Sequence, residues 1–114
     1  MFALVDNVVP EGSVGDYVNA FERFRDPSHL RAWPMAEWRA VLAAHGFAIA
    51  HEEQLYKQME FASWAGRHDA TMQALLRSML TQAAPEVKAV LAPQGKDGAT
   101  SFRLCEGLFI ARRR

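Results

Sequence analysis

An apolar run near the start of the chain constrains its fold more than any other segment. Residues 2–9 have the sequence FALVDNVV, which is rich in β-branched side chains, and a Pro10-Glu11-Gly12 turn follows. A short continuous apolar run predicts a β-strand that is buried on both faces, and such strands normally lie inside a parallel or mixed sheet. No upstream sequence supplies a neighbour, so we expect this strand to need partners from elsewhere.

Two helices are predicted after this strand. The first begins with Ser13 as its N-cap and Asp16 in the reciprocal position of a weak capping box, and it ends before Pro27. Its apolar stripe consists of Val14, Tyr17, Val18, Phe21 and Phe24. The second helix is predicted to begin with Pro34 at its first position and to end at Gly46, which would form a left-handed cap.

The rest of the chain is predicted to hold two strands separated by helices. The expected order is strand, short helix, helix, helix, polar loop and strand, at residues 47–57, 61–64, 70–80, 84–91, 94–98 and 101–111. The last strand is predicted to place four apolar side chains on one face, namely Phe102, Leu104, Leu108 and Ile110. The whole order is strand, helices, strand, helices, strand, which predicts one α/β domain over residues 1–114.

Composition narrows the class of protein. Thirteen basic and thirteen acidic residues give a formal net charge of zero, which argues against a nucleic-acid binder. No apolar stretch approaches the length of a membrane span, and the N-terminus does not resemble a signal peptide. We therefore expect a cytoplasmic domain. The one cysteine, Cys105, is expected to be a small buried hydrophobe. No metal site is predicted from the spacing of the histidines, which are His29, His45, His51 and His68.

Three segments in sequence order carry a resemblance to a known family. They are residues 4–11 (LVDNVVPE), residues 25–29 (RDPSH) and the Trp38 helix that ends in HGF. Together they resemble the C-terminal half of class I S-adenosylmethionine-dependent methyltransferases, in the branch of ubiquinone and menaquinone biosynthesis enzymes. The resemblance implies the β-α-β-α-β C-terminal part of a Rossmann-like sheet, with three strands, an antiparallel final pair and helices packed on the sheet.

The resemblance also implies that the cofactor-binding N-terminal half is absent. In the family, S-adenosylmethionine lies on the first four strands, where a glycine-rich turn follows a strand and an acid binds the ribose. Gly12 and Gly15 precede a helix that is predicted to have a polar cap, and Gly95 and Gly98 belong to a polar loop. Neither pair is expected to be a cofactor loop, so we expect this chain alone to bind no S-adenosylmethionine.

The candidate site residues on the substrate side fall into two groups. Asp6 and Asn7 lie near the carboxyl end of the first strand, where α/β proteins bind ligands, although they could simply end the strand and bond the turn. In the second group, Arg25 could pair with an acidic substrate and His29 could accept a proton. Asp26 belongs to the same turn, and an ordinary Asp-Pro-Ser turn with a surface ion pair explains that group equally well.

A third candidate is Tyr56. It belongs to an aromatic segment, residues 56–64, whose counterpart often lines the acceptor pocket in the resembling family. The simpler interpretation is that Phe61 and Trp64 only seat a short helix. The apolar stripe of the next helix is interpreted as core or as a dimer face, and it consists of Met72, Leu75, Leu76, Met79 and Leu80.

Two functions follow from these observations. In the first, the chain is the acceptor-side portion of a methyltransferase, a fragment that is inactive without the half that binds the cofactor and that takes a small-molecule acceptor. In the second, it is a freestanding binding or dimerisation module, because an exposed apolar strand needs to be covered or paired. The expected partner is accordingly the missing half or a second copy of the chain. The sequence does not identify the methyl acceptor.

Overall fold

The structure is a computed structural model that describes residues 1–95 and 99–114. Its elements, in chain order, are β1 (Phe2–Val8), α1 (Ser13–Arg25), α2 (Met35–Ala44), β2 (Phe47–Glu60), α3 (Phe61–Trp64), α4 (Ala70–Thr81), α5 (Pro85–Leu91) and β3 (Ser101–Arg113). The predicted order of strands and helices is therefore confirmed. The polar loop predicted at residues 94–98 lies partly outside the described residues, since Lys96, Asp97 and Gly98 are not described.

The three strands form one sheet in the order β1-β3-β2, with β3 in the middle. Both outer strands run antiparallel to β3, so the sheet is antiparallel throughout. The expected antiparallel pair of the last two strands is confirmed, since β2 pairs with β3. The expectation that the first strand lies in a parallel or mixed sheet was wrong for the described residues, because β1 also pairs with β3 in the antiparallel direction. Within the described residues, the other edge of β1 pairs with no named strand.

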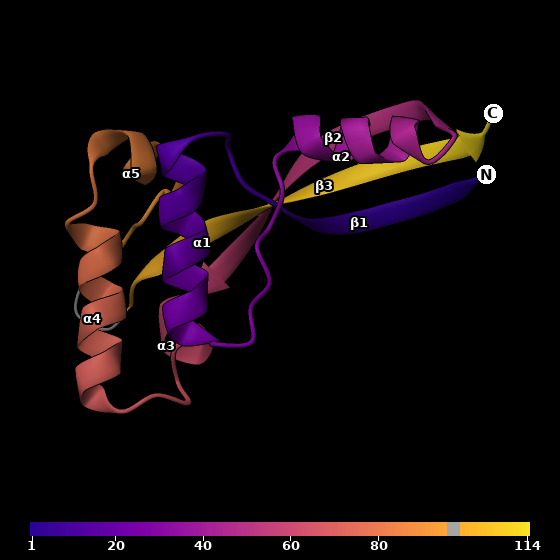
Figure 1. Cartoon of the computed structure of the whole chain (residues 1–114). Helices are drawn as coiled ribbons and strands as arrows, with labels where there is room; N and C mark the ends of the chain where they lie inside the picture. The colour runs from indigo at the N-terminus through magenta and orange to yellow at the C-terminus, as the bar shows by residue number, and fades with distance from the viewer. Residues whose placement is uncertain (96–98) are drawn as a thin grey trace.

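The molecule has the shape of an arm and a lobe (Figure 1). The arm is the sheet with α2 lying along it and with both chain ends at its tip, while α1, α3, α4 and α5 form the lobe at the other end of the sheet. The extents are 51 × 25 × 23 Å and the radius of gyration is 15.7 Å. A compact chain of this length has a radius of gyration of about 13 Å, so the chain is elongated. The helix α2 packs along the arm, and the lobe helices pack against the other end of β2 and β3, so the helices pack on the sheet as expected.

The centre of the lobe is an aromatic cluster. The ring of Trp64 stacks on Phe21 at a centroid distance of 4.6 Å and meets Phe102 edge-on at 5.0 Å. Leu76 and Leu80 of α4 are completely buried against this cluster, which confirms that part of the α4 stripe is core. The short α3 helix therefore serves to place Trp64 in the core, as the simpler interpretation of this segment predicted.

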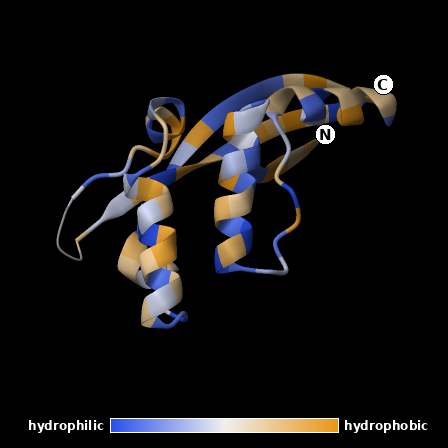
Figure 2. Cartoon of the chain, turned by 60° about the vertical axis from the view of Figure 1, so that its left-hand side comes forward, coloured by the Kyte–Doolittle hydropathy of each residue, from blue (hydrophilic) through white to orange (hydrophobic). Residues whose placement is uncertain are grey.

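The arm is less buried than its apolar sequence predicts. Val5 is 53% exposed and Phe2 is 38% exposed, so β1 is not buried on both faces as expected. The reason is that β1 is an edge strand and that α2 covers only one face of the sheet (Figure 1). Figure 2 shows hydrophobic segments, in orange, along the strands of this arm as well as on the helices.

Local details of α1 also differ from the prediction. Its N-cap is Gly12, with φ 78°, and no side chain caps the helix, so the capping box at Ser13 is not formed. Phe24, expected in the apolar stripe, is 48% exposed. The helix instead buries Asn19 and Glu22. Pro34 is the N-cap of α2 and not its first residue, while Gly46 has the predicted positive φ.

Both faces of β3 are buried, which the predicted alternation missed. Phe102 and Leu104 pack in the lobe core, as expected. Cys105, Phe109 and Ala111, which alternate with the predicted face, are also buried. The alternation failed because β3 is the central strand and crosses from the lobe into the arm, where α2 packs on the opposite face. The burial of Cys105 confirms its expected role as a small hydrophobe.

Candidate functional site

A cavity of 530 Å³ lies where the segment between α1 and α2 passes the carboxyl end of β1. We call it the β1 pocket. Its walls are formed by Asp6, Asn7, His29, Leu30, Arg31, Ala32, Trp33 and Trp38. The structure thus brings together three of the residues singled out from the sequence, namely Asp6, Asn7 and His29.

The segment at residues 29–33 is held in place from two sides. On α1, the buried Asn19 side chain forms two bonds with Ala32: its amide donates to the Ala32 carbonyl (3.2 Å), and its Oδ1 accepts from the Ala32 N–H (2.8 Å). On β1, Val8 forms a parallel bridge with Trp33. Asn19 therefore binds an extended segment much as a neighbouring strand would, and the pocket wall is fixed by its backbone.

Asn19 also determines the tautomer of His29. The His29 Nε2 atom lies 3.1 Å from Asn19 Oδ1, and that oxygen is identified because it already accepts from the Ala32 N–H. Since Oδ1 can only accept, Nε2 must carry the hydrogen and donate it. Neutral His29 then has its lone pair on Nδ1. Among the described residues, Nδ1 has no hydrogen-bond partner.

Two further charged groups lie on the α1 side of His29. Burial, with the nearby Arg23 guanidinium, lowers the pKa of His29, so its neutral form is favoured. The Glu22 carboxylate lies 3.8 Å from Nε2, and burial raises the pKa of Glu22. The arrangement can hold a neutral imidazole whose Nδ1 is free to accept a proton, with a carboxyl group behind the ring.

Acidification is expected to destabilise the chain through His29. Its pKa in the folded chain lies below the ordinary 6.5, so the unfolded chain binds more protons as the pH falls through 6.5 and the free energy of unfolding decreases. Glu22, whose pKa is raised, contributes the opposite slope above pH 4.5. Melting temperatures between about pH 7.5 and 5.5 should fall less for His29→Gln than for the unchanged chain. Equal losses would contradict this assignment.

The remaining wall of the β1 pocket is aromatic. The rings of Trp33 and Trp38 lie 4.6 Å apart at 50°, and both are half-buried. The indole nitrogen of Trp38 is buried without a hydrogen-bond partner among the described residues. Leu30, on the same segment, is 85% exposed. Half-buried aromatic side chains beside a few polar groups are typical of small-molecule pockets.

The charged groups of the β1 pocket are mostly used within the chain. Both terminal nitrogens of Arg31 bond the Glu37 carboxylate, at 3.1 and 2.5 Å. Asp6 Oδ1 accepts from the Asn7 N–H at 2.7 Å, which is the local bond expected of a turn, although the strand continues to Val8. The pocket therefore presents a paired cation and one exposed carboxylate.

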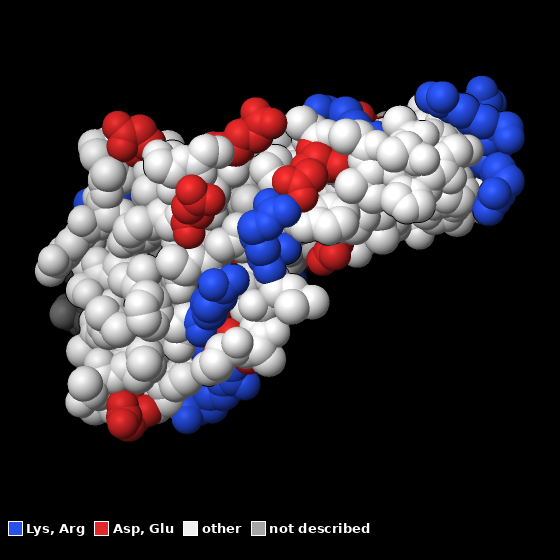
Figure 3. Space-filling model, in the orientation of Figure 1, with Lys and Arg blue, Asp and Glu red and all other residues white. Residues whose placement is uncertain are grey.

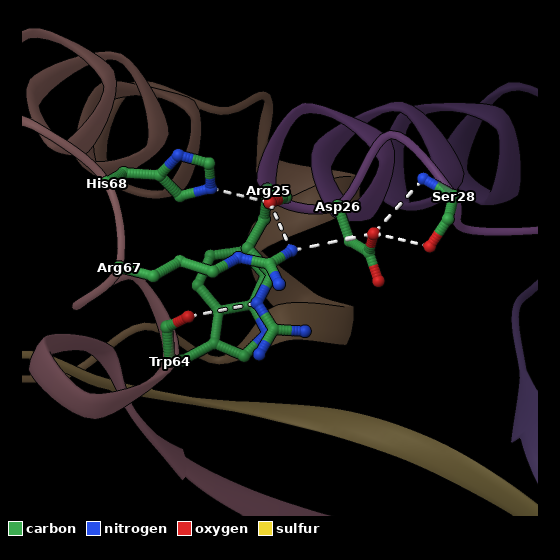
Figure 4. A network of polar contacts seen from close by, with 6 residues as sticks. All are labelled: Arg25, Asp26, Ser28, Trp64, Arg67 and His68. Carbon is green, nitrogen blue, oxygen red and sulfur yellow. Dashed lines mark hydrogen bonds and ion pairs between the residues drawn. The ribbon is translucent and has the colours of Figure 1, made fainter.

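Arg25 and Asp26 are held in a separate network at the end of α1 (Figure 4). Arg25 Nε donates to the Trp64 carbonyl at 2.9 Å, and the Arg25 carbonyl accepts from Arg67 and His68. Asp26 Oδ1 accepts from the Ser28 N–H and hydroxyl, and these bonds lower the pKa of Asp26. The Asp26 contacts match the turn interpretation, whereas Arg25 forms no ion pair among the described residues, and neither residue lines the β1 pocket.

Tyr56 is not among the residues that line this pocket. It lies on β2, is 56% exposed, and has the Arg103 guanidinium 4.1 Å from its ring centroid. Sequence reasoning missed Asn19, Glu22 and Trp33, which do shape the site. The sequence offered one signal, namely that the polar residues Asn19 and Glu22 lie beside the apolar positions of α1. Their burial, however, depends on where residues 29–33 pack.

At Gly15, the turn between β1 and α1 lacks the open space that a glycine-rich cofactor loop needs. Gly12 stands between β1 and α1, as in a cofactor loop, and Gly15 lies in the first turn of α1. However, a Cβ on Gly15 would lie 1.9 Å from the Pro10 carbonyl oxygen, so the chain's own backbone already fills the space that this glycine leaves. No group of three metal-ligating side chains is found among the described residues, and none of the described helices could cross a bilayer.

Comparison with known proteins shows that the chain is similar to methyltransferases. No protein-family profile matches the chain. Over 67 residues, which are 58% of the chain, it is 37% identical to YcgJ of Bacillus subtilis, an uncharacterized methyltransferase, and it covers 26% of that protein. A structure of a Bacillus halodurans protein described as a methyltransferase matches 96% of the chain, with a TM-score of 0.86 and 29% identity.

The structure of YcgJ itself matches 99% of the chain, with a TM-score of 0.82 and 28% identity. The chain covers 54% of the Bacillus halodurans chain and 50% of the YcgJ chain, so it spans about half the length of the solved relatives it matches. The chain is therefore related to methyltransferases, as the sequence resemblance implies, and corresponds to part of their fold.

Proposed function

We propose that the chain is the acceptor-side, C-terminal portion of an S-adenosylmethionine-dependent methyltransferase. The observation that carries this proposal is the structural match, with a TM-score of 0.86, over nearly the whole chain and about half of the relative. The conjunction of RDPSH with the segments around it supports the ubiquinone and menaquinone branch as the finer proposal.

In this proposal the chain and the other half have different tasks. S-adenosylmethionine, bound by the other half, would supply the methyl group. The β1 pocket would bind the small-molecule acceptor, because it lies beside the last residues of β1 and has half-buried aromatic walls with a few polar groups. The misfit of Gly15 to a cofactor loop supports the further proposal that the chain is inactive alone.

The bare face of the arm supports the need for a partner. Val5 on β1 and Leu55 on β2 are 53% and 38% exposed, and both lie on the sheet face opposite α2. An exposed apolar sheet face with a free strand edge is normally covered or paired. We propose the other half of a methyltransferase fold as its occupant, because the solved relatives contain such a half. A second copy of the chain is the alternative.

Light scattering distinguishes these two partners. The 12.8 kDa chain is mixed with the part of YcgJ that the structural match leaves uncovered, and masses are measured after size exclusion. The proposal predicts a one-to-one complex and a monomeric chain when alone. A stable homodimer that does not take up the YcgJ segment would favour the dimerisation module. Val5→Lys should weaken either complex, whereas Ser13→Lys on α1 should not.

A further inference from the structure

We propose that the free end of the arm binds the surface of a membrane that contains anionic lipids. This end, which we call the arm tip, is made by the start of β1, the start of β2 and the end of β3, and its residues are Phe2, Phe47, Arg112, Arg113 and Arg114. The inference goes beyond the proposed function, because none of these residues lines the β1 pocket and S-adenosylmethionine takes no part in it.

Strand pairing fixes the three arginines of the arm tip. Arg112 and Arg113 belong to β3 and pair with the first two residues of β2, and the Arg114 N–H donates to the Gly46 carbonyl at 2.9 Å. Because successive side chains of a strand point to opposite faces, Arg112 and Arg113 cover both sides of the tip. The basic run is therefore part of the sheet and presents its charges from a fixed backbone.

The positive charge of the arm tip is not compensated locally. All three arginines are exposed, and none of them forms an ion pair among the described residues. Figure 3 shows basic side chains, in blue, gathered at this end, with no acidic side chain among them on the face that is drawn. The other ten basic residues of the chain stand against thirteen acidic ones, so the remainder is negative. An anionic surface would thus orient this molecule, 51 Å long, with its tip forward.

Apolar rings lie directly beside these charges. Phe2 is 38% exposed and its ring meets Phe47 edge-on at a centroid distance of 4.9 Å, while the Arg113 guanidinium lies 5.2 Å from the Phe47 centroid. At a lipid surface, guanidinium groups bind the phosphates of the head groups while rings enter the boundary of the acyl chains. Double-stranded nucleic acid and acidic peptides offer anions but no apolar layer for the exposed ring. The combination therefore favours an anionic lipid surface.

Sedimentation of the chain with lipid vesicles tests the inference. The two probes are vesicles of phosphatidylcholine alone and vesicles in which about one third of the lipid is phosphatidylserine. Three arginines near the surface should make binding to the anionic vesicles about 100-fold tighter than to the neutral ones. Salt at about 1 M should abolish this preference. Replacing Arg112, Arg113 and Arg114 together with Gln should reduce it to about twofold or less.

Two control variants separate the arm tip from the chain as a whole. Replacing Arg23, Arg67 and Lys88 with Gln removes the same total charge from exposed positions of the lobe, and the preference should stay near that of the unchanged chain. Phe2→Ser should weaken binding to the anionic vesicles by about threefold, because the ring loses its apolar contact. Val5→Ser, on the same strand but outside the tip, should leave this binding unchanged.

Equal binding of the unchanged chain to both kinds of vesicle would overturn the inference, and this result needs no variant to fold. A preference that the lobe variant loses as fully as the tip variant would also overturn it, because net charge alone would then be responsible. So would displacement from the vesicles by a single-stranded DNA oligonucleotide together with unchanged binding of Phe2→Ser, which would show a site for polyanions in general. The measurement uses the chain alone, so it can fail while the complex with the YcgJ segment still forms, and the reverse also holds.

Discussion

Replacing Asn19 with Leu is expected to lower the free energy of unfolding by about 3 kcal/mol. The Asn19 side chain is 7% exposed and bonds both the N–H and the carbonyl of Ala32, as well as His29 Nε2. Leu has a similar volume, so it fills the site but leaves these buried polar groups unpaired, at about 1 to 3 kcal/mol for each group that stays dry. Urea unfolding followed by circular dichroism measures the loss.

Two variants make this prediction specific. Asn7→Leu makes the same substitution on β1, where the Asn7 side chain forms no hydrogen bond among the described residues. It should change the free energy of unfolding by less than about 0.5 kcal/mol. Asn19→Asp keeps the oxygen that accepts from Ala32 but loses the donor to its carbonyl. If Asn19→Leu were as mild as Asn7→Leu, the β1 pocket wall would not depend on Asn19 and the tautomer assignment would lose its basis.

Replacing Gly15 with Ala is expected to destabilise the chain by about 2 to 3 kcal/mol. The added Cβ would lie 1.9 Å from the Pro10 carbonyl oxygen, a backbone atom, so α1 and the turn before it must move apart. Without this clash the substitution would stabilise the helix, because Ala exceeds Gly in helix propensity by about 1 kcal/mol. A lower melting temperature for Gly15→Ala would show that the clash outweighs the gain in helix propensity, and a higher one would show the reverse.

The matched control is Ser13→Ala in the same helical turn. Ser13 makes no capping hydrogen bond, so its replacement should change stability by less than about 0.5 kcal/mol. If Gly15→Ala were stabilising, the turn would have room at this glycine. The turn between β1 and α1 would then again be a candidate for a ligand loop, contrary to the present account.

The elements that the sequence predicted well have strong local signals. The period of α4, the glycine that follows α2 and the short α3 that ends at Trp64 all appear at the expected positions. The errors arose where tertiary packing decides. Ser13 resembles an N-cap, yet the close contact of Gly15 with Pro10 makes Gly12 the cap. The burial of β1 depends on a neighbour that the described residues do not provide.

The sequence predicted the candidate site only in part, because tertiary contacts decide which polar residues line it. Asp6, Asn7 and His29 were found because residues beyond a strand end or in a turn with a histidine are typical of sites, and the fold places them around one pocket. Arg25 and Asp26 carry the same signals but bond within the chain. Asn19 could not be distinguished from a surface residue of α1, since its partner Ala32 is thirteen positions away.

Calorimetric titration with S-adenosylmethionine tests the central claim, that this chain is the acceptor side of a methyltransferase whose cofactor is bound elsewhere. The titration is made into the chain alone and into its complex with the uncovered half of YcgJ. We predict no saturable heat with the chain alone and one site per complex. Saturable micromolar binding by the chain alone would contradict the account, because the cofactor site would then lie among these residues.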